Sequence, residues 1–168
     1  MKQALVTCSA VFAALLFVAS GTADESKPKE KKGRKPVTEV KCPVAGKEIK
    51  IADAKVVEYR KAKLYVCCDG CKGKVEKDAA PFAAKANQQL AKTRQYRQAK
   101  CPISGGPIDK EQKLKVGGSL VRFCCEKCKA KAEGVEGDEQ LAMVFGDKAF
   151  EKAFVAVKKK KTKKDDAS

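Results

Sequence analysis

The chain has 168 residues, of which 43% are hydrophobic and 6% aromatic, and it contains neither tryptophan nor histidine. A chain of this length is one ordinary domain or two very small ones, and units of about 60 residues commonly need cross-links or metals because their apolar core is small. Lysine and arginine outnumber the acidic residues by 37 to 21, which gives a net charge of +16. Without histidine there is no Cys-His or Ser-His pair, and no glycine-rich phosphate loop occurs, so we do not expect an enzyme.

The first 23 residues predict a secretory signal peptide. Lys2 precedes an apolar run over residues 4–19, small residues follow, and we expect cleavage after Ala23. The alternative is an uncleaved N-terminal anchor, because residues 4–21 approach the roughly 18 residues of a membrane span. Cleavage would remove Cys8 and leave eight cysteines in a secreted or periplasmic chain that has no membrane span.

Two basic segments, residues 24–40 and 158–168, are predicted to be disordered and solvated. They contain the runs KPKEKKGRKP and KKKKTKK, which have almost no apolar side chains to bury. Such runs can contact an anionic polymer or membrane surface weakly and in a salt-sensitive way. Neither run interleaves aromatic residues, so we expect no specific nucleic-acid site.

Between these segments the chain contains the same pattern twice. The first copy begins with KCPVAGKEI at 41–49 and continues through KVVEYRKAKLYVCCDGCKGK at 55–74. The second begins with KCPISGGPI at 100–108 and continues through KLKVGGSLVRFCCEKCKAK at 113–131. An internal repeat of this kind indicates two copies of one structural unit, which we place at 41–80 and 100–157.

The elements of each copy follow the same order. A Cys-Pro-x-x-Gly turn opens the copy, a β-hairpin follows, and a lysine-rich helix begins after the cysteine cluster. The pair Gly117-Gly118 predicts a two-residue turn in the second hairpin, and the first hairpin should turn near residues 60–62. The two copies therefore predict a small α+β fold.

Two further helices are predicted outside this pattern. Residues 81–98 are predicted to form a helix, with Pro81 in its first turn. This helix occupies the segment 81–99, which connects the two copies. Residues 147–160 read as a C-terminal helix whose apolar residues recur at helical spacing and should pack on the small domain: Ala149, Phe150, Ala153, Phe154 and Val157.

The paired cysteines differ in the face of the strand they would occupy. Strand alternation places Cys68 and Cys125 on the apolar face, where they could be small buried hydrophobic residues, and Cys67 and Cys124 on the opposite face. A sulfur from the turn, one from the strand end and one from the helix start can converge on a single ion. The nearby lysines and the helix N-terminus should lower the thiol pKa values; these lysines are Lys72, Lys74, Lys127 and Lys129.

Each copy therefore predicts one site for a soft metal ion, either zinc or copper(I), because thiolates bind both. The expected ligands are Cys42, Cys67 and Cys71 in the first copy and Cys101, Cys124 and Cys128 in the second, with Cys68 and Cys125 as candidates for the fourth position. The alternative is a disulfide-stapled, basic interaction module of the cell envelope, because export and an even number of cysteines permit disulfides.

The motifs also resemble a known family. Cys-Pro-x-x-Gly, a hairpin and then Cys-Cys-x-x-Cys-Lys are similar to the TRASH and YHS family of small treble-clef-like modules, which are linked to heavy-metal binding, trafficking and sensing. The resemblance covers roughly residues 41–80 and 100–140, and it implies two tandem treble-clef-like units with a thiolate metal site in each. Many relatives carry a further cysteine in the opening turn, where this chain has Ala45 and Ser104.

Overall fold

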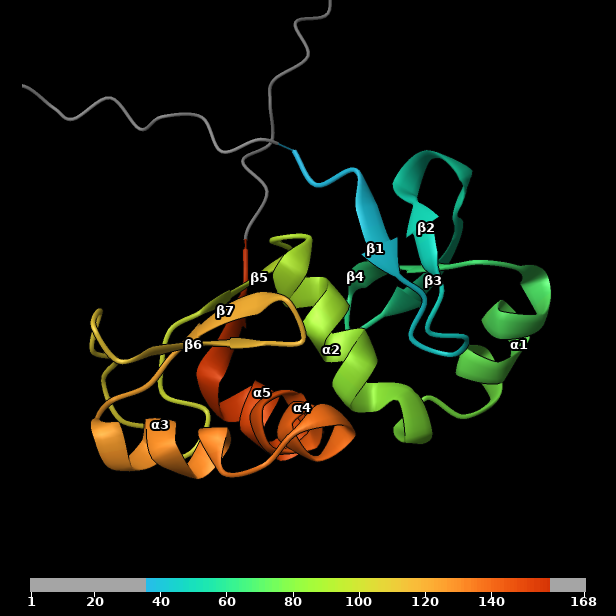
Figure 1. Ribbon diagram of the computed structural model, residues 1–168. Coiled ribbons are helices and arrows are strands. Elements are labelled where there is room, and N and C mark those ends of the chain that lie inside the picture. The colour runs from blue at the N-terminus through green and yellow to red at the C-terminus, as the bar shows by residue number, and fades with distance from the viewer. Residues whose placement is uncertain (1–35, 158–168) are drawn as a thin grey trace, which may run out of the picture. The chain divides into compact units, whose positions relative to one another are not determined.

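The computed structural model describes residues 36–157. The predicted signal peptide, the basic segment up to residue 35 and the tail from residue 158 lie outside the described residues. Residues 36–157 belong to one compact unit, in which five α-helices accompany four two-stranded antiparallel sheets (Figure 1). The described part of the chain is thus a small α+β fold, as the sequence predicts.

The first repeat begins with a hairpin around its Cys-Pro turn. Strands β1 (Glu39–Lys41) and β2 (Glu48–Lys50) pair antiparallel, and the 3₁₀ turn η1 (Ile51–Asp53) follows them. Strands β3 (Lys55–Tyr59) and β4 (Ala62–Val66) form the predicted hairpin, and helix α1 (Asp69–Lys77) comes after the cysteine pair. Because β1 begins at Glu39, the linker predicted for 24–40 extends two residues too far.

The second repeat contains the same hairpin and helix. Strands β6 (Lys113–Val116) and β7 (Ser119–Arg122) pair antiparallel and precede helix α3 (Glu126–Glu133). The turn residues Gly117 and Gly118 have φ angles of 54° and 85°, which confirms the predicted two-residue turn. Arg60 and Lys61 adopt the same positive φ region, at 51° and 60°, in the first hairpin.

The predicted connecting helix is shorter than expected. The 3₁₀ turn η2 (Ala80–Phe82), which contains Pro81, leads into helix α2 (Ala83–Lys92). The chain then reverses at Arg94, which has a φ of 59°, and continues as strand β5 (Tyr96–Gln98). The prediction of a helix through residue 98 was wrong because pairing of β5 with a distant strand overrides the local helical preference.

That distant strand lies where the C-terminal helix was predicted. Helix α4 (Gly137–Phe145) and helix α5 (Asp147–Ala153) are followed by strand β8 (Phe154–Ala156), which pairs with β5. The predicted helix over 147–160 therefore ends at Ala153, and Val157 is 43% exposed rather than packed. Phe150, Ala153 and Phe154 are buried as expected.

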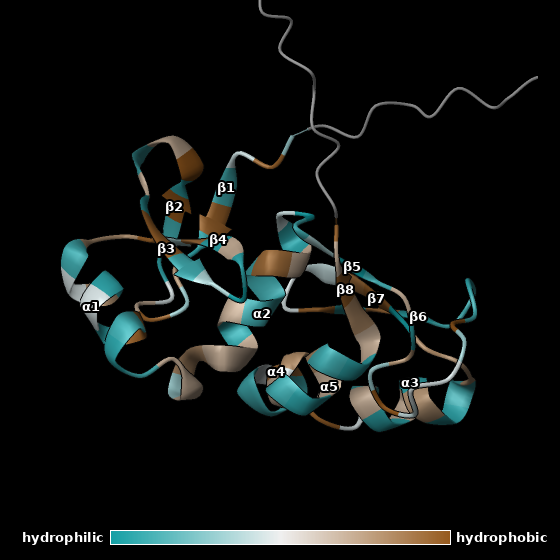
Figure 2. Ribbon diagram, turned by 180° about the vertical axis from the view of Figure 1, so that it is seen from behind, coloured by the Kyte–Doolittle hydropathy of each residue, from teal (hydrophilic) through white to brown (hydrophobic). Residues whose placement is uncertain are grey.

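Both repeats share one hydrophobic core. Helix α2 contacts β4 of the first repeat and α4 and α5 of the second, and both views show it between the two repeats (Figures 1 and 2). The fully buried side chains come from both repeats and from α2, and they include Leu64, Val66, Leu90, Phe123, Phe145 and Phe150. The sulfur-bearing segments of the two repeats are thus attached to the same core.

Candidate metal centre

The opening turns of the two repeats have the same backbone hydrogen bonds. The amide of Cys42 donates to the carbonyl of Lys47 at 2.8 Å, and the amide of Gly46 donates to the carbonyl of Cys42 at 2.9 Å. The turn at Cys101 repeats both bonds, at 2.9 and 2.8 Å. Gly46 and Gly105 have φ angles of 69° and 80°, which glycine adopts without strain. Each turn therefore presents its cysteine in the same way.

Three cysteine sulfurs converge in each repeat. The groups are Cys42, Cys67 and Cys71 in the first and Cys101, Cys124 and Cys128 in the second, and within each group all sulfurs lie within 4.8 Å of one another. The first sulfur of a group comes from the opening turn, and the third comes from the first turn of the following helix. The second sulfur comes from a residue that lies one or two positions after the end of the second hairpin strand. This convergence is the arrangement that the sequence predicts.

The sulfurs of each group differ in their surroundings. Burial raises the pKa of Cys42, but the backbone amides of Ala45, Cys67 and Val44 outweigh it and lower the pKa overall. In contrast, burial and the neighbouring thiols raise the pKa of Cys71 to about 12, and the pKa of Cys128 rises to about 12 for the same reasons. Binding of a cation to either group would therefore release protons from the helix cysteine.

The expected effect of the lysines is wrong for these two helix thiols. Lys72 lies 3.9 Å from Glu76, and Lys129 lies 3.4 Å from Glu133, so each pairs with a glutamate of its own helix. The burial of the sulfurs of Cys71 and Cys128, together with their thiol neighbours, determines the direction of their pKa shifts.

Cys68 and Cys125 stand beside the groups and are exposed. Their interpretation as buried hydrophobic residues was wrong, because β4 ends at Val66 and β7 ends at Arg122, so strand alternation does not reach the cysteine pairs. Both residues instead precede a helix, with extended backbone angles. The Cys68 sulfur lies 3.8 Å from that of Cys67, and the corresponding distance in the second repeat is 3.6 Å.

The second group has an oxygen neighbour that the first group lacks. The Ser104 hydroxyl lies 3.1 Å from the Cys124 sulfur and accepts a hydrogen bond from the amide of Gly106 at 3.1 Å. Burial raises the pKa of Cys101, but the Ser104 side chain and nearby backbone amides lower it to about 6. The equivalent position of the first turn is Ala45, which has no hydroxyl.

Two glutamines hold the sulfur-bearing segments together. In the first repeat, the Gln89 amide nitrogen donates to the carbonyls of Lys41 and Tyr65 at 2.9 and 2.8 Å, and its oxygen accepts from the Tyr65 amide at 2.7 Å. Lys41 precedes the turn cysteine, and Tyr65 lies two residues before Cys67. One side chain thus bridges two segments that each carry a sulfur.

Gln98 makes the same bridge in the second repeat. Its amide nitrogen donates to the carbonyls of Lys100 and Arg122 at 3.0 and 2.5 Å, and its oxygen accepts from the Arg122 amide at 2.9 Å. Gln89 lies on α2 and Gln98 on β5, so the two positions are not equivalent in the sequence repeat. Sequence reasoning missed both residues, because no motif or periodicity distinguishes them from other glutamines.

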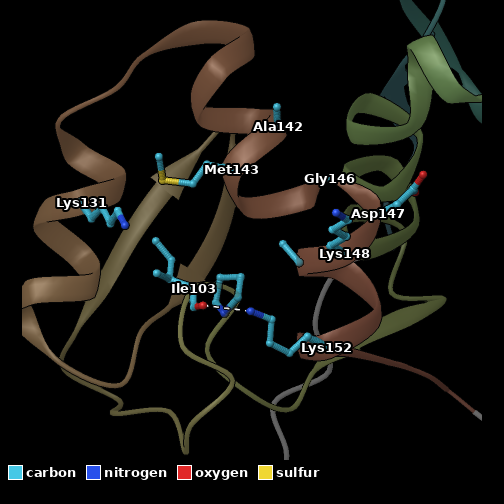
Figure 3. A pocket seen from close by; sticks show the side chains of 10 residues that line it. Ile103, Lys131, Ala142, Met143, Gly146, Asp147, Lys148 and Lys152 are labelled. Atoms are coloured by element: carbon cyan, nitrogen blue, oxygen red, sulfur yellow. Dashed lines mark hydrogen bonds between the residues drawn. The ribbon is translucent and has the colours of Figure 1, made fainter.

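A cavity of about 480 Å³ lies next to the second opening turn (Figure 3). The Lys152 amine of α5 donates to the carbonyl of Ile103 at 2.9 Å on one side of this cavity. A side chain at Gly105 would meet the Lys152 chain at 2.8 Å, so glycine permits this close approach. Helix α5 therefore supports the turn that carries Cys101.

The described cysteines are all free thiols. The Cys67 and Cys71 sulfurs are 3.5 Å apart, and those of Cys124 and Cys128 are 3.6 Å apart, whereas a disulfide requires about 2.05 Å.

Within residues 36–157, no helix is long and apolar enough to cross a lipid bilayer.

Comparison with protein-family models, with curated proteins and with solved structures found no significant match to this chain. The chemistry of the two sulfur groups is therefore the guide to function. Three thiols within 4.8 Å of one another, present twice, are compatible with the binding of one metal ion by each group.

Proposed function

We propose that this protein binds soft metal ions through cysteine thiolates, one ion in each repeat. The observation that carries the proposal is the pair of three-sulfur groups, which the fold assembles in the same way in both repeats. The ligands are Cys42, Cys67 and Cys71 in the first repeat and Cys101, Cys124 and Cys128 in the second.

The ligand type favours zinc or copper(I) as the ion. Each group contains sulfur only, and the chain has no histidine to supply nitrogen. Thiolates suit soft and borderline cations, whereas calcium and magnesium require oxygen ligands. A copper(I) or zinc ion held in this way would serve metal trafficking, buffering or structural stabilisation.

We further propose that each repeat is a treble-clef-like module of the TRASH and YHS type. The order of elements supports this assignment, because a Cys-Pro turn, a hairpin and a short helix follow one another twice. The assignment would account for the position of each sulfur, since a metal at the junction of turn, strand end and helix start can stabilise a unit with a small core.

The setting that we propose for this activity is outside the cytoplasm. The N-terminal sequence reads as a signal peptide, which would deliver the protein to the periplasm or the exterior. The net charge of +16 would allow weak, salt-sensitive contact of the basic segments with anionic surfaces.

Metal analysis of the purified chain tests the proposal. The reduced protein, loaded anaerobically with zinc or copper(I) and desalted, should hold close to one ion per repeat. Cys71→Ser and Cys128→Ser should each remove one ion, and the double variant should hold none. Leu120→Ala is the control, because it removes an exposed side chain outside the sulfur groups and should leave the stoichiometry unchanged.

An unchanged stoichiometry in the double variant would contradict the proposal. Thiol titration of the native, metal-free protein separates it from the disulfide alternative. Free thiols in both repeats support metal binding, and a protein without free thiols is a disulfide-stapled module.

A further inference from the structure

In each repeat, a fourth sulfur lies at the surface beside the three-sulfur group. Cys68 and Cys125 are exposed, whereas the cysteine of each opening turn is at most 1% exposed. The exposed sulfurs lie 3.8 and 3.6 Å from the nearest strand-end sulfurs, those of Cys67 and Cys124. An exposed sulfur in this position can contact both the group and a molecule in solution.

The backbone holds the two exposed cysteines in the same conformation. Cys68 precedes α1 with φ −158° and ψ 169°, and Cys125 precedes α3 with φ −161° and ψ 168°. The residues that follow differ, being Asp-Gly in the first repeat and Glu-Lys in the second. The position of the exposed sulfur at the start of the helix is therefore common to both repeats, although the residues that follow it differ.

The three sulfurs of a group cannot all meet an external molecule. Those of the opening turns are buried, Cys71 is 8% exposed, and Cys67, Cys124 and Cys128 are less exposed than Cys68 and Cys125. An ion held by such sulfurs leaves by ligand exchange, in which an incoming sulfur binds before an outgoing one is released. The sulfur that both touches the group and faces the solvent provides the shortest route for this exchange.

We propose that Cys68 and Cys125 are transfer ligands, which take an ion from the three-sulfur group and present it to a thiol-bearing acceptor. The inference rests on the proposed function, because it treats the bound ion as cargo. A bond from the ion to the exposed sulfur forms as a bond to a group sulfur breaks, and an acceptor sulfur then replaces the exposed one. Further acceptor sulfurs replace the remaining group sulfurs one at a time, until the acceptor alone holds the ion. The ion keeps its oxidation state, and protons lost by incoming thiols pass to the released thiolates or to water.

The test compares metal content with the rate of metal transfer. The full chain and the variant carrying Cys68→Ser and Cys125→Ser are loaded with copper(I), mixed with excess dimercaptosuccinate, desalted at intervals and analysed for copper. The variant should hold as much copper as the unsubstituted chain, and its transfer should be roughly tenfold slower, because the acceptor must reach a less accessible sulfur. The control carries Asp69→Ser and Glu126→Ser, which change the neighbouring exposed residues and should leave the rate unchanged.

Alkylation of the loaded chain provides a second measurement. Iodoacetamide should label Cys68 and Cys125 while the six group cysteines stay protected, as read by mass spectrometry of the peptides. Loss of copper from the serine variant, an unchanged transfer rate, or protection of Cys68 and Cys125 would each overturn the inference while leaving metal binding intact. An unsubstituted chain that binds no metal overturns the proposed function and this inference together.

Discussion

One position of the opening turn places a hydroxyl beside the sulfurs in the second group only, and it is Ala45 in the first repeat and Ser104 in the second. The backbone hydrogen bonds of the two turns are the same, so the difference is confined to the side chain. The Ser104 hydroxyl lies 3.1 Å from the Cys124 sulfur and also lowers the pKa of Cys101. A hydroxyl in this place stabilises negative charge on the sulfurs of the second group.

We therefore expect Ser104→Ala to weaken metal binding by the second group by about tenfold, the lower end of the usual range for residues that hydrogen-bond to ligands. Ala45→Ser should strengthen binding by the first group, because the same turn would place a hydroxyl beside its sulfurs. Competition titrations with a chromophoric chelator measure both effects when Cys71→Ser or Cys128→Ser removes the other site. Equal affinities of the second group with and without the hydroxyl would contradict the prediction.

At the scale of the elements, the relative position of the sulfurs depends on the two bridging glutamines. Gln89 and Gln98 each join the residue before an opening turn to the hairpin strand that leads to the cysteine pair. Removal of either side chain leaves backbone amide and carbonyl groups without their partners, and each such group costs about 1–3 kcal/mol when it is buried. The turn and the strand could then separate, which would widen the sulfur group.

Gln89→Ala should consequently weaken metal binding by the first group by about tenfold and leave the second group unchanged, whereas Gln98→Ala should do the reverse. Cobalt(II) titration measures the loss, because the intensity of the thiolate-to-cobalt absorption bands reports the sulfur environment as well as the affinity. The matched control is Gln95→Ala. Gln95 pairs with the amide and carbonyl of Lys63 on the same strand, at 2.7 and 2.6 Å, but farther from the cysteines.

The Gln95→Ala variant should lose some stability while its cobalt spectrum and affinity remain those of the unsubstituted chain. If Gln89→Ala and Gln95→Ala weaken metal binding equally, the effect belongs to general stability of the strand and not to positioning of the sulfurs.

The features that sequence reasoning predicted are those fixed by neighbouring residues. The Cys-Pro-x-x-Gly turns and the hairpins follow from short spacings, and the convergence of the group cysteines was predicted because the same order of turn, hairpin and cysteine pair occurs twice. The features that it missed depend on distant contacts. Strand β5 pairs with β8 across more than fifty positions, and Gln89 acts on residues of the first turn and hairpin. Local helical spacing around residues 96–98 and 154–156 gives no information about such pairing.

At the scale of the whole described unit, the two repeats are joined by more than a linker. The Arg60 guanidinium, in the hairpin turn of the first repeat, pairs with Asp147 and Glu151 of α5 at 2.7 and 3.0 Å. The Asn87 amide of α2 donates to the Phe145 carbonyl at 2.9 Å. These contacts and the shared core predict that residues 36–157 unfold as one cooperative unit.

Phe150 is the residue at which this cooperativity is best tested. It is 1% exposed, its ring lies 4.7 Å from that of Phe154 and 5.0 Å from that of Tyr96, and the Arg60 guanidinium lies 5.7 Å from its ring. Phe150→Ala should lower the free energy of unfolding by about 3–5 kcal/mol, because it removes a buried aromatic side chain and leaves a cavity. The loss should appear as a single transition at lower denaturant concentration, with a slope like that of the unsubstituted chain.

Hydrogen exchange locates the effect within the chain. Amides of β4 in the first repeat and of β7 in the second should lose protection together in Phe150→Ala, although Phe150 belongs to the second repeat alone. The control is Leu120→Ala, which removes a side chain that is 52% exposed and should change the stability by less than about 0.5 kcal/mol. Two separate transitions, or full protection of β4 in Phe150→Ala, would show that the repeats unfold independently despite their shared core.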